Sequence, residues 1–385
     1  MQRRSFPNSF GGQYETGGWE RVRLLNLPGN AADAARDAVA LLDAPDLPFR
    51  EDAVLVLESS QLALQIHESV GHATELDRIL GSEAAYAGTS WVSATDRGTL
   101  RYGSPLMTVV ADATTPYAMG TFGYDDEGVP AGEAHIVTDG ILTGYLTDRQ
   151  SAAMLGEQSN GTARADTWGD IPLIRMNNVS LQPREGDRAS IVADTDDGFL
   201  LLTNRSWSID DKRLNFQFGC EVAYEIRGGQ LGRMYRNSTY AGRTPDFWGS
   251  CDALGGPSDW TVWGVPNCGK GQPSQTARVA HGAPTGTPSD PASFDWNWTY
   301  ADPTCAGVTV DYPSDIPEGQ ANDVNIRVET PEGKAEYVAA QLTAFREGAR
   351  PNSPQMMQIA AKLNDREIRA VADYIAAYED EMEQL

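Results

Sequence analysis

Two histidines and a glutamate stand together in the run His67-Glu68-Ser69-Val70-Gly71-His72. In the zinc-protease pattern H-E-x-x-H, histidines four residues apart share one helix face and bind one metal, and the glutamate acts on the metal's water. Here the spacing is five, and on a regular α-helix five residues turn through roughly 500°, which leaves the two side chains about 140° apart. A shared metal therefore requires a distorted helix.

The flanking sequence predicts a helix that contains such a distortion. Apolar residues recur between Leu62 and Leu80, and Gly81 stands where a helix is expected to end. A π-bulge brings residues i and i+5 onto one face, and Gly71 is the position where a bulge or a kink is easiest. The alternative interpretation is that both histidines pack, hydrogen-bonded, on a half-buried helix without a metal.

A catalytic zinc uses three protein ligands and a water, so a third ligand must come from elsewhere in the chain. Cys220 lies in an alternating run and is interpreted as a small buried strand residue. Cys251 is expected in a loop and carries no signal. Cys268 lies in a Gly- and Pro-rich segment, 264–273, which predicts a loop where packing needs no thiol. Its neighbour Lys270 favours the thiolate that a metal requires, so Cys268 is the preferred candidate.

The rest of the chain up to about residue 280 has mainly strand patterns. Short apolar or alternating runs are separated by Gly, Asp, Asn and Pro, at 54–57, 106–110, 134–137, 141–145, 200–204 and 216–226. One helical pattern, 31–42, precedes them. Strands without regular intervening helices predict an α+β fold with a largely antiparallel sheet and a metal-binding helix. Asp139-Gly140 predicts a hairpin turn, and His135 is interpreted as a sheet residue.

Composition excludes several classes of protein. The 385 residues have a formal net charge of −24 and no clustered Lys and Arg, which opposes nucleic-acid binding. No apolar run approaches the roughly 18 residues of a membrane span, and no secretion signal is recognised at the N-terminus. The four cysteines form no C-x-x-C pair, so neither a zinc knuckle nor a dense disulfide framework is indicated. A cytoplasmic protein is the default expectation.

From about Trp19 to Val279 the sequence resembles the TldD/PmbA family, specifically its zinc-binding TldD-like members. The resemblance is carried by the H-E-x-x-x-H run, the acidic turn of Phe122–Pro130, Gly140–Leu146 with Asp148-Arg149, and Asn267-Cys268-Gly269-Lys270. The acidic residues of the turn have two open interpretations, a solvated turn or a role in positioning the metal helix or the substrate.

This resemblance implies a zinc metallopeptidase that acts on small, unfolded peptides. It implies that His67, His72 and Cys268 bind the metal and that Glu68 is the general base. It also implies a partner, either a TldE/PmbA-like subunit that lacks the zinc motif or a second copy in a homo-oligomer. Nickel, cobalt or iron suit the same ligands as zinc.

Four segments are expected along the chain. Residues 1–20 are interpreted as the remnant of an N-terminal domain, and 21–280 as the metallopeptidase domain. Residues 281–328 are dense in Pro, Gly and Asp and predict a linker or irregular loop. Residues 329–385 predict a small appendage of two helices.

The tail resembles the end of a class I cytochrome c, in which Met356 or Met357 would occupy the place of the axial haem ligand. Attachment of haem requires C-x-x-C-H, which this sequence lacks, so no haem is expected.

Three functions are therefore in competition. The first is zinc-dependent peptide hydrolysis. The second is a non-catalytic, truncated subunit or partner-binding scaffold of a TldD/TldE-type assembly. The third is an electron carrier that uses the tail, and the missing haem motif makes it the weakest.

Overall fold

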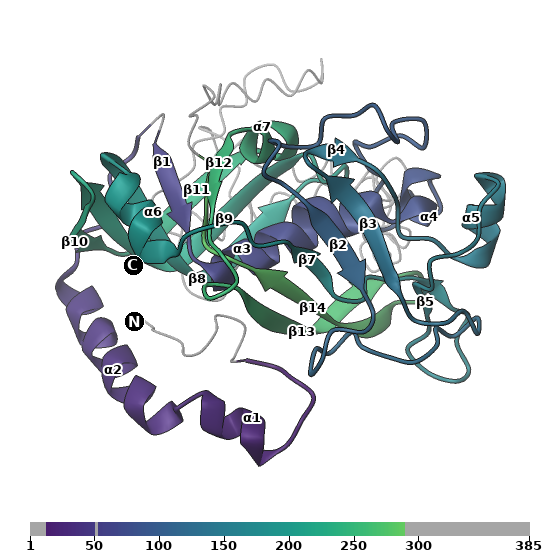
Figure 1. The fold of residues 1–385 in the computed structure, drawn as a ribbon, viewed down its shortest axis with the longest axis horizontal. Helices are drawn as coiled ribbons and strands as arrows, with labels where there is room; N and C mark the ends of the chain where they lie inside the picture. Colours follow the sequence, from purple (N-terminus) through teal and green to yellow (C-terminus); the bar gives the residue numbers. More distant parts are fainter. Residues whose placement is uncertain (1–12, 51–52, 289–385) are drawn as a thin grey trace, which may run out of the picture. The chain divides into compact units, whose positions relative to one another are not determined.

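The computed structural model describes residues 13–50 and 53–288 (Figure 1). The helices are α1 Trp19–Leu24, α2 Leu27–Asp43, α3 Ser59–Ile66, α4 Leu76–Ile79, α5 Arg149–Met154, α6 Arg188–Asp194 and α7 Thr244–Gly249, with a π-helical turn His67–Gly71 and a 3₁₀ turn His72–Thr74 between α3 and α4. The strands are β1 Val54–Leu57, β2 Val109–Asp112, β3 Glu133–Thr138, β4 Ile141–Leu142, β5 Ala163–Arg164, β6 Leu173–Ile174, β7 Val179–Leu181, β8 Asp197–Ile209, β9 Asn215–Arg227, β10 Gln230–Tyr235, β11 Ser238–Arg243, β12 Cys251–Leu254, β13 Thr261–Lys270, β14 Gln275–Ala283 and β15 Gly286–Pro288.

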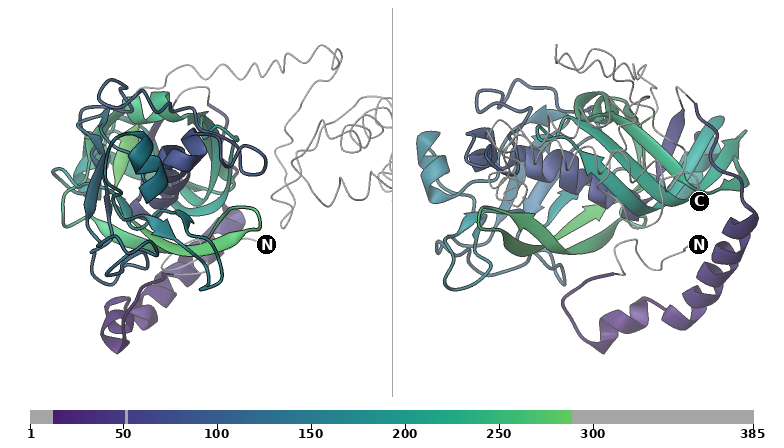
Figure 2. Two further views of the ribbon diagram at one scale, coloured as in Figure 1. Left: turned by 90° about the vertical axis from the view of Figure 1, so that its right-hand side faces the viewer. Right: turned by 180° about the vertical axis from the view of Figure 1, so that it is seen from behind.

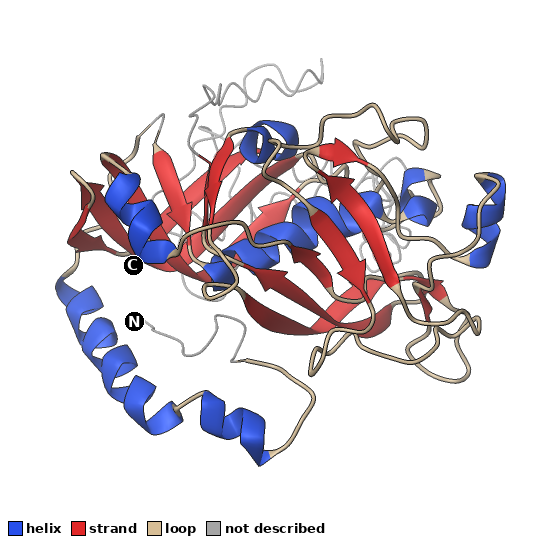
Figure 3. Ribbon diagram, in the orientation of Figure 1, coloured by secondary structure: helices blue, strands red, loops and turns tan. Residues whose placement is uncertain are grey.

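The largest sheet has seven strands in the order β10-β9-β8-β1-β15-β12, and β11 pairs with β9. Its centre is the long antiparallel hairpin of β8 and β9, paired from Asp197 opposite Arg227 to Ile209 opposite Phe216, with a shift of register between Asn204 and Ser206. Strand β1 joins β8 in parallel. A second sheet has the order β4-β3-β2-β7, and two smaller sheets are formed by β13 with β14 and by β5 with β6. The predicted α+β class with largely antiparallel sheets is confirmed (Figure 3).

Helix α3 lies at the centre of this arrangement, with strands around it in all views (Figure 2). Every residue of α3 is buried, and the helix contacts strands of three sheets, β8, β14, β13 and β7. A helix that is buried all round must satisfy its own polar groups. The buried Gln61 donates a hydrogen bond of 3.0 Å to the Tyr240 hydroxyl, which donates one of 2.9 Å to Gln65. Helix α3 is therefore held from several sides.

Local predictions succeeded where the sequence pattern was regular. The run 54–57 is β1, and Asp139 and Gly140 take φ angles of 48° and 80° in the turn between β3 and β4. Both loop predictions for cysteines were wrong, because Cys251 begins β12 and Cys268 lies in β13. Proline in 264–273 does not prevent a strand, since Pro266 lies at a bulge and Pro273 lies in the connection to β14.

The ends of the described chain bear on the predicted segments. Strand β14 continues through Ala283 and β15 follows, so the boundary predicted at residue 280 falls inside a strand. The rest of the predicted linker and the predicted helical appendage lie outside the described residues. The helical pattern 31–42 lies within α2, whose Leu41, together with Ala44 just after the helix, packs against Val222 of β9. No helix among the described residues has both the length and the apolar character needed to cross a membrane.

Candidate metal centre

The π-helical turn brings the two histidines of the motif onto one side of the helix. The His72 backbone N–H donates to the carbonyl of His67, five residues earlier, which is the hydrogen bond of a π-helix. The two imidazole rings lie edge to face with their centroids 4.9 Å apart. The predicted π-bulge is thus confirmed, and it compensates for the spacing of five residues.

Two neighbours hold the π-turn in place. Gly71 packs so tightly against the Met176 thioether that a β-carbon at this position would collide with it. Tyr102, fully buried, donates a hydrogen bond of 2.5 Å to the Ser69 carbonyl. Since a π-turn redirects backbone carbonyls away from their usual helical donors, this phenol supplies a partner in the protein interior.

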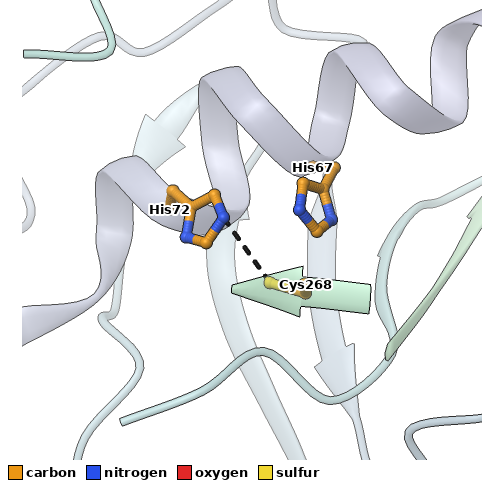
Figure 4. A group of neighbouring side chains, drawn as sticks. All are labelled: His67, His72 and Cys268. Carbon is orange, nitrogen blue, oxygen red and sulfur yellow. Dashed lines mark hydrogen bonds between the residues drawn. The ribbon is translucent and has the colours of Figure 1, made fainter. Parts of the chain in front are cut away.

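Cys268 faces the two histidines from β13 (Figure 4). The ladder between β13 and β14 shifts register between Val265 and Cys268, and such bulges redirect a side chain. The buried Arg175 donates to the backbone carbonyls of Cys268 and Gln275, and so clamps both strands beside the bulge. The Cys268 sulfur lies 3.6 Å from His72 Nε2.

The three side chains suit a zinc ion. Their ligand atoms lie within 4.8 Å of one another, and all three residues are buried. A tetrahedral zinc with bonds of about 2.3 Å to sulfur and about 2.0–2.1 Å to nitrogen separates these two atoms by about 3.6 Å. The distance between Cys268 and His72 matches that value. Two imidazoles and a thiolate leave a fourth position for water or substrate, as in a catalytic zinc site.

Electrostatics favour the thiolate at Cys268. Burial by itself raises the pKa of this thiol, but the neighbouring His72 and His67 more than offset burial and hold the pKa well below its usual value. Burial likewise lowers the pKa of His72, and the charges of Glu75 and Cys268 more than reverse the effect, so the pKa of His72 is raised. Burial dominates at His67 and lowers its pKa to about 4. A thiolate and a neutral imidazole are the forms that ligate a metal.

The carboxylate of Glu68 is held beside this cluster by two donors. Arg213 Nη1 lies 2.5 Å from Oε2, and Trp207 Nε1 lies 2.9 Å from Oε1. Together with Asn267, these side chains line a cleft that also contains His67, His72 and Cys268. The cleft joins a positioned carboxylate to a set of metal-binding donors, which is the combination required for hydrolysis by activated water.

The match to known proteins covers most of the described residues. The PmbA/TldA metallopeptidase C-terminal domain matches residues 51–288. The chain belongs to the TldD/PmbA metallopeptidase family. A metalloprotease from Methanocaldococcus jannaschii is 32% identical to this TldD/PmbA member over 255 residues, which are 66% of this chain and 53% of that protein. The chain spans about half the length of the curated relatives it matches.

Two further likenesses concern the metal and the fold. A protein from Saccharolobus solfataricus named zinc metalloprotease TldD homolog is 25% identical over 195 residues, covering 49% of this chain and 41% of that protein. The crystal structure of TldE from Thermococcus kodakarensis has the same fold at 18% identity and a TM-score of 0.55, covering 68% of this TldD/PmbA chain and 54% of TldE.

Other residues singled out from the sequence lie outside this cluster. Cys220 is fully buried in β9, as predicted, and burial raises the pKa of its thiol. His135 is in β3 and lies 3.1 Å from Glu133, with about half of its side chain exposed. Asp125 of the acidic turn is buried and accepts hydrogen bonds from the backbone of Glu127 and Ala163, among others, so it organises the turn.

Residues that the sequence did not reveal complete the surroundings of the candidate metal centre in this TldD/PmbA chain. Behind His67 lies His281 of β14, with His67 Nδ1 and His281 Nε2 2.7 Å apart. Behind His72 lies Glu75, whose Oε2 is 3.0 Å from His72 Nδ1 and 3.3 Å from Lys270 Nζ. Only the position of Glu75, three residues after His72, was a usable signal, because such spacing places residues side by side on a helical turn.

Proposed function

We propose that this chain hydrolyses peptide bonds with one zinc ion held by His67, His72 and Cys268. The observation that carries the proposal is the buried cluster of these donors in the same cleft as Glu68. When bound, zinc would supply Lewis-acid polarisation of the scissile carbonyl and would acidify water in its open position. The zinc metalloprotease named in Saccharolobus solfataricus supports the choice of metal.

Glu68 is proposed as the general base, which accepts the proton of the attacking water and passes it to the leaving amine. Its two hydrogen bonds, to Arg213 and Trp207, orient the carboxylate, and each oxygen keeps a second lone pair for a water. Small, unfolded peptides remain the proposed substrates. The cleft is lined along β13 by Val265, Asn267, Cys268 and Gly269, which supports binding of an extended chain.

The chain is also proposed to work as part of an assembly, with a TldE-like subunit or with a second copy. Its fold likeness to TldE supports this idea. So do the exposed Trp19 and Leu24 of α1, a helix with no buried residue in the described structure. Mass measurement of the full chain, alone and mixed with the purified TldE-like protein, distinguishes the two forms.

The first test of the metal site is the zinc content of the full chain purified without added metal. We expect about one zinc per chain in the native protein and a clear loss in Cys268→Ser. Cys251→Ser is the matched control, because Cys251 is also buried but lies outside the cluster. Zinc that is absent, or indifferent to Cys268, contradicts the site and favours the alternative of a non-catalytic subunit.

The second test separates metal binding from chemistry. Glu68→Gln should keep its zinc while the kcat for cleavage of unstructured peptides falls by about 10²–10⁴-fold, the usual contribution of a general base. Glu133→Gln, on the exposed side of β3, is the control and should leave both properties unchanged. Full activity in Glu68→Gln would remove Glu68 from the mechanism.

A further inference from the structure

His281 is a fully buried imidazole held rigidly behind the metal centre. It lies in β14, where its backbone neighbours are fastened to the segment around β7. The Ala280 N–H donates to the Asn177 carbonyl at 3.2 Å, and the Gly282 N–H donates to the Ser180 hydroxyl at 2.8 Å. The ring of His281 is therefore placed by backbone contacts on both sides of it.

The ring nitrogens of His281 form a hydrogen-bonded chain that ends at a metal-site residue. Nδ1 lies 2.7 Å from the Val179 carbonyl oxygen, and Nε2 lies 2.7 Å from His67 Nδ1. A carbonyl oxygen can only accept a hydrogen bond, so His281 Nδ1 carries a proton. In the neutral ring Nε2 is then an acceptor, and His67 Nδ1 must be the donor.

Other arrangements of the protons are unfavourable. If neutral His67 carried its proton on Nε2, two lone pairs would face each other at the 2.7 Å contact with His281. If His281 carried its proton on Nε2, two acceptors would face each other at Val179. A doubly protonated His281 would place a cation in the fully buried space between a carbonyl group and an imidazole, which is energetically costly.

We propose that His281 is a positioning residue that holds His67 as the tautomer protonated on Nδ1, with the Nε2 lone pair free for the metal. This inference rests on the proposed metal site, in which His67 is a ligand through the nitrogen that His281 does not engage. The opposite tautomer would carry a proton on that nitrogen and would have to rearrange before it could bind. Partners of this kind commonly set the tautomer and orientation of metal-bound histidines.

The composition of the chain makes the tautomer directly measurable. The protein has four histidines, of which three lie in this cluster and His135 is on the surface. Long-range ¹H–¹⁵N correlation spectra of the full, metal-free chain labelled with ¹⁵N-histidine report which nitrogen of each ring is protonated. We expect His67 and His281 both protonated on Nδ1. A native His67 protonated on Nε2 overturns the proposal without any variant.

Substitution adds a functional readout. His281→Phe keeps an aromatic ring but offers no acceptor, so the single tautomer of His67 should be lost and zinc affinity should fall about 10–100-fold. His281→Gln offers an amide oxygen in the same place and should restore most of both. His135→Phe, the matched surface control, should change neither. An unchanged His67 spectrum and zinc affinity in His281→Phe would overturn the proposal.

The two readouts separate this inference from the proposed function. The tautomer is measured without metal and zinc affinity without substrate, so an absence of peptide hydrolysis leaves both results interpretable. Conversely, a hydrolytic enzyme whose zinc affinity ignores His281 retains the proposed function and loses the positioning role. Where His281→Phe fails to fold, the native spectrum and the Gln variant decide the outcome.

Discussion

The regions behind the two histidines of the candidate metal centre differ in charge. Behind His67 the groups are neutral: the imidazole of His281 and the backbone carbonyl of Val179. Behind His72 they are charged, because Glu75 Oε2 contacts both His72 and Lys270. The charges of Lys270 and His72 overcome the effect of burial and hold the pKa of Glu75 far below its usual value.

Through these two regions the candidate metal centre contacts two distant parts of the chain. The neutral contacts attach the π-turn to β14 and β7. The charged contacts attach it to β13, since Lys270 lies two residues after Cys268 and also reaches Asp77 at 2.7 Å. A carboxylate hydrogen-bonded behind a histidine makes the imidazole a stronger electron-pair donor to a metal than a neutral partner does. His72 is therefore expected to be the more basic ligand of the two.

Removal of the buried cation should have the largest effect. Lys270→Met leaves the carboxylates of Glu75 and Asp77 without their shared ammonium group, and should lower the free energy of unfolding of the metal-free protein by about 3–5 kcal/mol. Denaturant titration measures the change. Lys212→Met, the same substitution at an exposed position, should cost less than about 0.5 kcal/mol. Equal losses of stability in Lys270→Met and Lys212→Met would show that the charged region does not stabilise the fold.

Acid should reduce the contribution of His67 and His281, in the neutral region, to the stability of the fold. Burial lowers the pKa of His67 and His281 to about 4 each, below the value of about 6.5 in an unfolded chain. Between these pH values the unfolded chain binds more protons than the folded protein. The contribution of each ring to the free energy of unfolding is therefore fully present above about pH 6.5. It falls by up to about 3 kcal/mol for each ring as the pH drops toward 4.

The contribution of His72 to stability should change with pH in the opposite direction. Its pKa is raised, because Glu75 and Cys268 outweigh burial, so its contribution is complete below about pH 6.5 and is lost as pH rises through the folded value. Chemical unfolding of the metal-free protein between pH 7.5 and 4.5 tests both signs. His281→Gln should reduce the loss of stability in acid. If the free energy of unfolding depends on pH as steeply in this variant as in the native protein, the acid effect does not come from His281.

Neutralising the carboxylate should alter the metal site more than the fold. Glu75→Gln keeps the shape of the side chain but removes the charge behind His72, and zinc affinity should fall about 10–100-fold. Competition with a chromophoric chelator measures this. Glu133→Gln is a matched control, because it changes a glutamate beside the exposed His135. A loss of affinity in the control as large as in Glu75→Gln would point to a change in overall charge.

The smallest expected effect is the coupling between the two regions. The neutral and charged groups share no hydrogen-bond partner among the contacts described, so Glu75→Gln and His281→Gln should have additive effects on the metal-free free energy of unfolding, within about 0.5 kcal/mol. A double-mutant cycle measures the coupling free energy between the two substitutions. Coupling above about 1 kcal/mol would mean that the two regions act as one network through the adjacent imidazole rings.

The sequence by itself determined the local features of this protein. The spacing of His67 and His72 in an apolar helix required a distortion, and the structure contains the π-turn. Short apolar or alternating runs predicted strands such as β1 and β9, and Asp139-Gly140 predicted a tight turn. These features depend on side-chain periodicity and backbone preferences within a few residues, which a sequence displays directly.

Only the tertiary structure decided which distant residues surround the metal site. Segment 264–273 predicted a loop, but pairing with β14 and a bulge at Pro266-Asn267 make residues 264–270 part of a strand that directs Cys268 at His72. His281 contacts His67 across 214 residues, and no local pattern encodes that contact. Contacts of this kind depend on strand register and sheet packing, in which a shift of one residue turns a side chain to the opposite face.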